Sequence, residues 1–189
     1  MSIETIDLYQ IHRPDFLGHP VEIASVLTKL REEGKIREVG VSNYTPSQFS
    51  VLQAYLDFPV VTRQPEFSCW KHDPLRNGIL DQCLEYQTTP LAWSPLGGGT
   101  LTWTLEKAQA ENQTLANLLT KLDEIASEQG VSRTAVALAW IMCHPSKIIP
   151  IIGTQTPSRI RDSWSALQVK LTRPQWNEIL VAAQGYPLP

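Results

Sequence analysis

Short apolar runs recur along the chain, and segments with a helical pattern separate them. Each run has the length of a strand and is mostly β-branched or aromatic. Several are apolar at consecutive positions, which is typical of strands buried on both faces of a parallel sheet. The runs predict strands at Ile6 to Ile11, Val39 to Val41, Val60 to Thr62, Leu91 to Trp93 and Ile148 to Ile152.

Between these runs, apolar residues recur at the spacing of one helix face. The pattern i, i+3, i+4 and i+7 predicts helices around residues 23–30 and 115–122. Gly34 and Gly130 stand where these two helices would end. A capping box over residues 45–48, with proline at the first helical position, predicts the start of another helix.

Strands that alternate with helices predict right-handed crossovers and a parallel sheet, either doubly wound or closed into a barrel. The sequence holds five such units, whereas a closed barrel of this kind needs eight strands and about 250 residues. We therefore expect an α/β fold that is either open by design or truncated at its start. A strand pattern that begins at Ile6, with Met1 as an internal start, favours truncation. Residues 1–189 are expected to form a single domain.

Composition and charge narrow the classes of partner. The chain has 189 residues, of which 42% are hydrophobic, and a net charge of -3 without any run of Lys or Arg. Neither a nucleic acid nor an anionic membrane is therefore an expected partner. No apolar stretch approaches the roughly 20 residues that span a bilayer, and the N-terminus lacks the pattern of a signal peptide.

Three widely spaced cysteines stand among apolar neighbours. Cys69, Cys83 and Cys143 are therefore predicted to be buried free thiols rather than disulfides or metal ligands. Free thiols favour a reducing, cytoplasmic location. The four histidines are scattered and show no spacing typical of a zinc site.

Polar residues follow each predicted strand. In parallel α/β architectures, ligands bind beyond the carboxyl ends of the strands, so these residues are candidates for a site. The five polar ends begin at His12, Ser42, Gln64, Ser94 and Gly153.

The last of these ends predicts an anion site. Thr156 and Pro157 begin a helix whose third residue is Arg159, a cation where the helix dipole already presents positive charge. That placement costs stability unless an anion binds, and free N–H groups beside an arginine fork suit a phosphate. A solvated arginine on a surface helix explains the segment alone equally well.

A glycine loop follows the fourth predicted strand. The segment from Ser94 to Gly99 would let backbone amides approach a pyrophosphate, although it also suits a flexible connection. Trp93, directly before the loop, suits stacking on a flat ring or packing in the core. His12 would be structural in most settings, but a titratable ring at the carboxyl end of a barrel strand indicates catalysis.

These motifs together resemble the aldo-keto reductase superfamily, from Ile6 to the C-terminus. The segment from Ile6 to His12 is similar to the family's strand that bears its catalytic histidine, and Gly34 to Asn43 resembles the next signature. The resemblance implies part of a TIM (β/α)8 barrel, namely strands 4 to 8 with their helices. It implies an enzyme that reduces a small aldehyde or ketone to an alcohol with NADPH, or with NADH as the other possible cofactor.

The resemblance also implies a role for each site residue. His12 is the catalytic residue, and Trp93 stacks on the nicotinamide ring. The implied contacts are Ser42, Asn43 and Gln64 at the carboxamide, Ser94, Leu96 and Gly97 at the pyrophosphate, and Gly153, Thr154, Arg159 and Asp162 toward the adenosine end. Arg159 is the residue implied to contact a 2′-phosphate.

The sequence departs from the family pattern at several positions. Gly153 stands where many members carry a lysine for the 2′-phosphate, Arg63 where an asparagine usually precedes Gln64, and Ser163 near the adenine position. Of the family's catalytic aspartate, tyrosine, lysine and histidine, only His12 is present. A missing general acid typically costs roughly 10²- to 10⁴-fold in rate, so we expect the chain alone to be inactive.

Three functions follow as alternatives. The chain is part of a carbonyl reductase that is completed by an N-terminal segment, or it is a non-catalytic nucleotide-binding or interaction subunit, or it is a fragment without function. Exposed strand edges predict that the chain aggregates or recruits a partner, either such an N-terminal segment or further copies in a homo-oligomer. Trp70, Trp103 and Phe67 suit either an apolar substrate pocket or the core.

Overall fold

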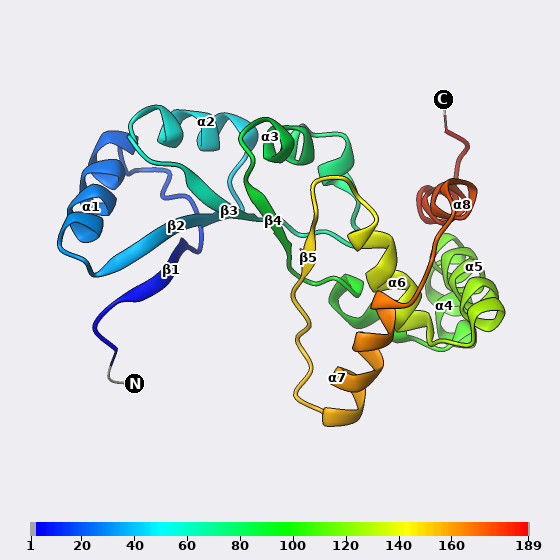
Figure 1. Cartoon of the computed structure of the whole chain (residues 1–189). Coiled ribbons are helices and arrows are strands. Elements are labelled where there is room, and N and C mark those ends of the chain that lie inside the picture. The colour runs from blue at the N-terminus through cyan, green and yellow to red at the C-terminus, as the bar shows by residue number, and fades with distance from the viewer. Residues whose placement is uncertain (1–2, 189) are drawn as a thin grey trace. The chain divides into compact units, whose positions relative to one another are not determined.

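A computed structural model describes residues 3–188, and the chain divides into two compact units (Figure 1). Unit 1 comprises Met1–Pro65 and Pro74–Leu91, and unit 2 comprises Glu66–Asp73 and Ala92–Pro189.

Unit 1 alternates strands with helices, as the hydrophobic pattern predicts. The Thr45 hydroxyl accepts a hydrogen bond from the backbone N–H of Gln48, and the Gln48 side chain accepts one from the backbone of Thr45, so the predicted capping box is confirmed. A short 3-10 turn, η1 (Asp73–Leu75), precedes the third helix. The helices and strands are β1 (Ile6–Ile11), α1 (Pro20–Glu32), β2 (Ile36–Ser42), α2 (Pro46–Ala54), β3 (Val60–Gln64), α3 (Ile79–Glu85) and β4 (Thr89–Ala92).

The strands of unit 1 pair in parallel, in the order β1, β2, β3, β4. Ile11 lies opposite Val41, and Ser42 lies opposite Gln64. The carboxyl ends of β1, β2 and β3 therefore meet at one edge of the sheet. The residues that follow these strands gather at that edge, which is the position expected for a ligand in this architecture.

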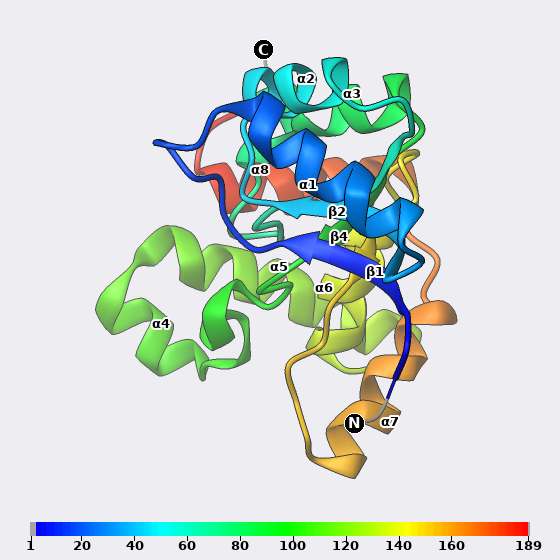
Figure 2. The same cartoon turned by 90° about the vertical axis from the view of Figure 1, so that its left-hand side faces the viewer.

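Helices α1 and α2 cover one face of this sheet, as Figure 2 shows. The layer between them is apolar: Val39, Phe49 and Leu52 are at most 2% exposed. Strand β1 is not buried on both faces, since Leu8 and Tyr9 are 37% and 39% exposed. The physical reason is that β1 is the edge strand of unit 1 and pairs only with β2.

Unit 2 is mostly helical. Helix α5 packs against α4, α6 and α8. The hydrophobic pattern missed α6 because seven of its ten residues are buried, so no polar face marks its period. The elements are η2 (Gly97–Thr102), α4 (Leu105–Glu111), α5 (Gln113–Gln129), α6 (Arg133–Met142), β5 (Ile149–Pro150), α7 (Pro157–Trp164), η3 (Ser165–Leu167) and α8 (Arg173–Gln184).

Strand β5 is shorter than predicted. It covers two residues, although the apolar run extends from Ile148 to Ile152. The Ile151 N–H donates to the backbone oxygen of Ala92 at 2.9 Å, and both residues belong to unit 2. Ile151 and Ile152 are nevertheless 39% and 37% exposed and line a pocket. The last apolar residues of the run thus leave the strand and contribute to a site.

Aromatic packing forms part of the core of unit 2. The rings of Trp140 and Trp176 stack with centroids 4.7 Å apart, and each indole N–H donates to the backbone oxygen of the other tryptophan at 3.0 Å. Phe67 is fully buried and packs on Trp140. Phe67 therefore belongs to the core rather than to an exposed substrate pocket, and Trp103 is covered by the ammonium of Lys107 at 3.8 Å from its ring centroid.

The three cysteines are free thiols, and Cys69 and Cys83 are buried, as predicted. Cys143 is exposed, so the prediction of burial is wrong there; this residue caps the C-terminus of α6, where the helix reaches the surface. Burial raises the pKa of Cys69, and it raises that of Cys83 to about 11. Within residues 3–188, no helix has both the length and the apolar character to cross a membrane.

Candidate functional site

Four of the residues singled out from the sequence lie at the strand ends of unit 1, and hydrogen bonds join them. Ser42 Oγ and the backbone N–H of Asn43 donate to the backbone oxygen of Gln64, at 3.0 and 3.2 Å. Asn43 Nδ2 donates to Ser42 Oγ at 3.1 Å and to the backbone oxygen of His12 at 3.2 Å. The structure therefore brings His12, Ser42, Asn43 and Gln64 into one cluster, which we call the amide cluster.

A further set of polar residues, which sequence reasoning did not name as functional, supports Gln64. Gln10 Nε2 donates to Gln64 Oε1, and Thr62 Oγ1 donates to Gln10 Oε1 at 2.9 Å. A Cβ at Gly40 would lie 2.0 Å from Thr62 Oγ1 and 2.8 Å from Gln10 Oε1, so only glycine fits there. The sequence signal that could identify Gln10 is strand alternation, which puts Gln10 on the same face of β1 as His12.

Arg63, a departure from the family pattern, is buried with 1% of its surface exposed. Its Nη1 donates to Gln82 Oε1, and its Nη2 donates to the backbone oxygen of Tyr44 at 2.7 Å. Burial lowers the pKa of the guanidinium, whose carbon lies 5.2 Å from the centre of the Phe49 ring. These contacts tie the loop after β2 to α3, so Arg63 supports the backbone that carries the amide cluster.

Unit 2 contains a pocket of about 610 Å³, a size typical of small-molecule sites. The loop after β4 and the segment from Ile151 to the first turns of α7 line it. Six of the residues singled out from the sequence are in this lining: Ser94, Leu96, Gly153, Thr154, Arg159 and Asp162. Trp93 and Gly97 are not in the lining. The pocket is also lined by four residues that the sequence pattern does not mark as functional: Thr102, Thr134, Ile151 and Ile152.

The loop after β4 has a backbone that requires glycine. Gly97, Gly98 and Gly99 have φ angles of 60°, 65° and 97°, in the left-handed region. A Cβ at Gly98 or Gly99 would meet no atom within 4 Å, so both leave open space beside the backbone. Ser94 has a φ of 47° without being glycine, and such strained residues cluster at functional sites. The loop therefore leaves open space beside its main chain at Gly98 and Gly99, where it lines the pocket.

The first turn of α7 presents positive charge to the pocket. It contains no acidic residue, its cap Thr156 makes no side-chain hydrogen bond to the helix, and Arg159 is exposed. Thr154 Oγ1 accepts from the Thr156 N–H at 3.2 Å. Asp162 Oδ2 accepts from Ser132 Oγ at 2.8 Å, which joins α7 to the start of α6. Helix dipole and guanidinium together favour an anion here.

The two sets of residues suit different chemical groups. The pocket of unit 2 suits a ligand that carries phosphate, because it combines a glycine loop with a cationic helix start. The amide cluster of unit 1 offers neutral hydrogen-bonding groups, and the exposed residue His12 joins it through its backbone oxygen. Over the described range 3–188, no group of three or more His, Cys, Asp or Glu side chains is placed to hold a metal ion.

The chain is similar to known proteins in sequence and in fold. The sequence model described as the Aldo/keto reductase family matches residues 1–182. A 6-dehydroglucose reductase from Novosphingobium aromaticivorans is 45% identical over 100% of this chain and 60% of its own length. A second 6-dehydroglucose reductase, from Agrobacterium fabrum, is 42% identical over 98% of this chain and 59% of its own length.

A solved structure shares the α/β fold. The glycerol dehydrogenase from Gluconobacter oxydans matches with a TM-score of 0.83 at 25% identity, over 99% of this chain and 62% of that protein. The chain thus spans about 60% of the length of the proteins to which it is similar.

Proposed function

Because the chain belongs to the aldo/keto reductase family, we propose that it carries the cofactor side of an oxidoreductase that reduces a small aldehyde or ketone to an alcohol with NADPH. The observation that carries the proposal is the pocket of unit 2, which a glycine loop and the cationic first turn of α7 both line. That combination suits the phosphates of a dinucleotide.

The proposed contacts follow the chemistry of the residues. Neutral hydrogen-bonding groups are proposed to hold the nicotinamide carboxamide: Ser42, Asn43 and Gln64. The Trp93 ring is proposed to stack on the nicotinamide. The loop is proposed to hold the pyrophosphate through Ser94 and Leu96, with Gly97 shaping the turn. The remaining lining residues are proposed to contact the adenosine end: Gly153, Thr154, Arg159 and Asp162.

Arg159 is the reason for proposing NADPH rather than NADH as the cofactor. An arginine beside the ribose accommodates the 2′-phosphate that distinguishes the two cofactors. Gly153 cannot serve as a cationic partner, although many family members carry a lysine at its position. The proposed preference therefore depends mainly on Arg159 and on the dipole of α7.

We expect Arg159→Met to weaken NADPH binding by roughly 10- to 100-fold, because it removes charge-assisted hydrogen bonds to the phosphate. NADH binding should stay within about twofold, since NADH lacks that phosphate. Isothermal titration of the chain with each cofactor measures both effects. Arg161→Met is the matched control, because Arg161 is an exposed residue in the last turn of the same helix. An equal loss for both cofactors, or no loss, would contradict the proposed role.

The α/β fold and the family membership together support a more specific proposal about the architecture. We propose that residues 1–189 form one domain and correspond to strands 4 to 8 of a (β/α)8 barrel. An N-terminal complementing segment would supply the remaining strands. Supporting observations are the exposure of β1 at the edge of unit 1 and the chain's span of about 60% of its relatives.

The proposed chemistry divides between this chain and that segment. A bound NADPH supplies a hydride to the carbonyl carbon, while a side chain must give a proton to the carbonyl oxygen. His12 would orient the carbonyl at the end of β1. The proton donor of the family is a tyrosine beside a lysine, and we propose that both, with the aspartate, come from the complementing segment.

The relatives suggest which carbonyl compounds to assay first. Two proteins above 40% identity carry the name 6-dehydroglucose reductase, so an aldehyde at the end of a sugar is the first substrate class to test. The three free thiols are compatible with a cytoplasmic protein, which we propose as its location.

A second candidate is a non-catalytic subunit that binds a nicotinamide nucleotide or a partner protein. The observation in its favour is that the chain carries the pocket and the amide cluster, but of the family's four catalytic residues only His12. This candidate would be supported if the chain binds NADPH saturably but shows no turnover, whichever N-terminal segment completes it. An insoluble chain that binds no nucleotide would indicate a fragment without function.

A further inference from the structure

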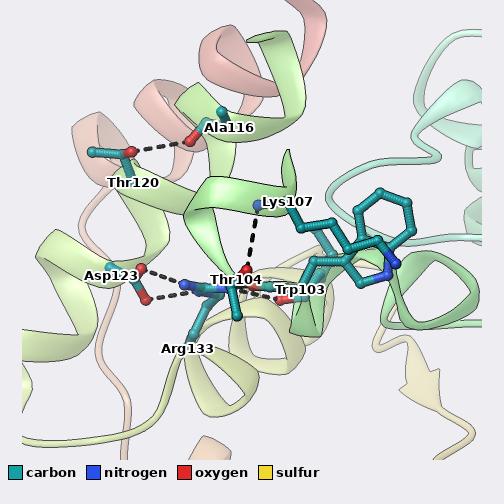
Figure 3. Close-up of polar contacts among 8 residues, drawn as sticks. Trp103, Thr104, Lys107, Ala116, Thr120, Asp123 and Arg133 are labelled. Atoms are coloured by element: carbon teal, nitrogen blue, oxygen red, sulfur yellow. Dashed lines mark hydrogen bonds and ion pairs between the residues drawn. The ribbon is translucent and has the colours of Figure 1, made fainter. Parts of the chain in front are cut away.

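Arg133 donates four hydrogen bonds within unit 2, and Figure 3 shows it between Asp123 and Trp103. It is the first residue of α6. Its Nε donates to Asp123 Oδ1 at 2.7 Å, and its Nη2 donates to Asp123 Oδ2. Its Nη1 donates to the backbone oxygen of Trp103 at 2.7 Å and to that of Leu101 at 3.3 Å. One guanidinium therefore joins α5, α6 and the end of η2, directly after the glycine loop.

The two carbonyl groups that Arg133 holds flank a residue of the pocket. Leu101 and Trp103 stand on either side of Thr102, and Thr102 lines the pocket. Thr134, which follows Arg133 directly, lines the pocket as well. Arg133 thus links the loop wall of the pocket to its α6 wall.

The other hydrogen bonds described for residues 94–103 are internal to this segment. The Thr100 and Thr102 hydroxyls donate to the backbone oxygens of Gly97 and Gly99, each at 2.8 Å, and the Trp103 N–H donates to that of Thr100 at 3.1 Å. The Leu96 backbone oxygen accepts from the N–H groups of Gly99 and Leu101, at 3.0 and 3.3 Å. Gly98 and Gly99 lie in open space and have left-handed backbones. Glycines lose more conformational freedom on ordering than other residues. Arg133 therefore supplies hydrogen bonds that join the far end of this segment to α5 and α6.

The positive charge of Arg133 interacts with other residues of the protein and not with the proposed ligand. Asp123 neutralises it with two parallel hydrogen bonds, and the Arg133 side chain is only 18% exposed. Lysine could not replace this arrangement, because an ammonium lacks the planar fork that reaches a carboxylate and two carbonyls together. Arg133 is also absent from the residues that line the pocket.

We propose that Arg133 is a positioning residue, which holds the loop Gly97–Thr102 in the conformation that binds the pyrophosphate of the dinucleotide. The proposal rests on the proposed function. Arg133 would act only through the loop, so it should affect ligands that reach the loop and spare ligands that occupy the α7 side of the pocket alone.

Two ligands of the full-length chain separate these effects in isothermal titration. NADP⁺ carries the pyrophosphate, whereas adenosine 2′-phosphate lacks it and retains the group proposed for Arg159. Arg133→Met should raise the Kd for NADP⁺ about tenfold, because hydrogen bonds that fix the loop are lost. The Kd for adenosine 2′-phosphate should change by less than about twofold.

Arg173→Met is the matched control. Arg173 is also the first residue of a helix, follows a threonine cap and is exposed, so neither Kd should change. Arg133→Lys keeps the positive charge and the stem, and it serves if the methionine variant does not fold. It should weaken NADP⁺ binding in the same selective way.

The outcomes distinguish the inference from the proposed function. An equal loss for both ligands, or no loss for NADP⁺, would contradict the role of Arg133 while the wild-type chain still binds NADP⁺. A wild-type chain that binds neither ligand would contradict the proposed function, and the inference would fall with it.

Discussion

The chain alone is expected to show no measurable carbonyl-dependent oxidation of NADPH, even where it binds the cofactor. The reaction needs a proton donor with a lowered pKa beside the carbonyl oxygen. Tyr44, the tyrosine closest in sequence to the proposed carboxamide contacts, has a buried hydroxyl without a hydrogen-bond partner among residues 3–188. Burial raises the pKa of Tyr44, which is opposite to the shift that a proton donor needs. The loss of NADPH absorbance with sugar aldehydes measures the rate.

Completion of the chain should restore the activity. The N-terminal part of a 6-dehydroglucose reductase, fused ahead of this chain, would supply the tyrosine and lysine of the family. Turnover should then rise by at least roughly 10²-fold over the chain alone, the lower end for a general acid.

Matched histidine variants test the role of His12 in that completed protein. His12→Asn should lower kcat by roughly 10²-fold or more. His19→Asn should leave kcat unchanged, because His19 caps α1 through Nδ1 and asparagine also serves as a cap. Turnover by the chain alone, or equal activity of the two variants, would contradict the account.

Gly40→Ala is expected to lower the free energy of unfolding by about 3 kcal/mol, at the upper end for overpacked cores. The new Cβ would lie 2.0 Å from Thr62 Oγ1, a distance that side chains do not tolerate. Thr62 is buried and hydrogen-bonded to Gln10, so neither can move without breaking the support of Gln64. Denaturant unfolding followed by circular dichroism measures the change.

Two further variants locate the cause of that loss. Gly153→Ala should change stability by less than about 0.5 kcal/mol, because its Cβ would meet nothing within 4 Å. Thr62→Ala removes the closest atom, so the double variant should recover part of the Gly40→Ala loss, as expected for coupled neighbours. Strict additivity of Gly40→Ala and Thr62→Ala would show that the close approach is not the cause.

The helices and strands that could be predicted are those marked by a short sequence motif or a regular hydrophobic pattern. The capping box at Thr45 and the proline at the start of α7 mark helix starts directly, and both helices begin where predicted. Helix α6 lacks such a period because it is buried on nearly all sides. Strand β5 was overestimated because an apolar run does not show where strand pairing stops.

The site residues divide in the same way. Strand ends and the glycine loop are visible in sequence, and the structure puts Ser94, Thr154 and Arg159 in one pocket. Gln10 and Arg133 act through partners that lie 54 and 30 positions away along the chain, at Gln64 and Trp103. No local pattern reveals these partners, although strand alternation puts Gln10 on the same face of β1 as His12.

Hydrogen–deuterium exchange of the chain with and without NADPH tests the central claim most directly. The proposed site predicts slower amide exchange in residues 94–102 and 153–163 when NADPH binds. Helix α1 (Pro20–Glu32), which contributes no residue to the pocket, should exchange at an unchanged rate. Unchanged exchange in both pocket segments, or protection confined to α1, would contradict a cofactor site in unit 2.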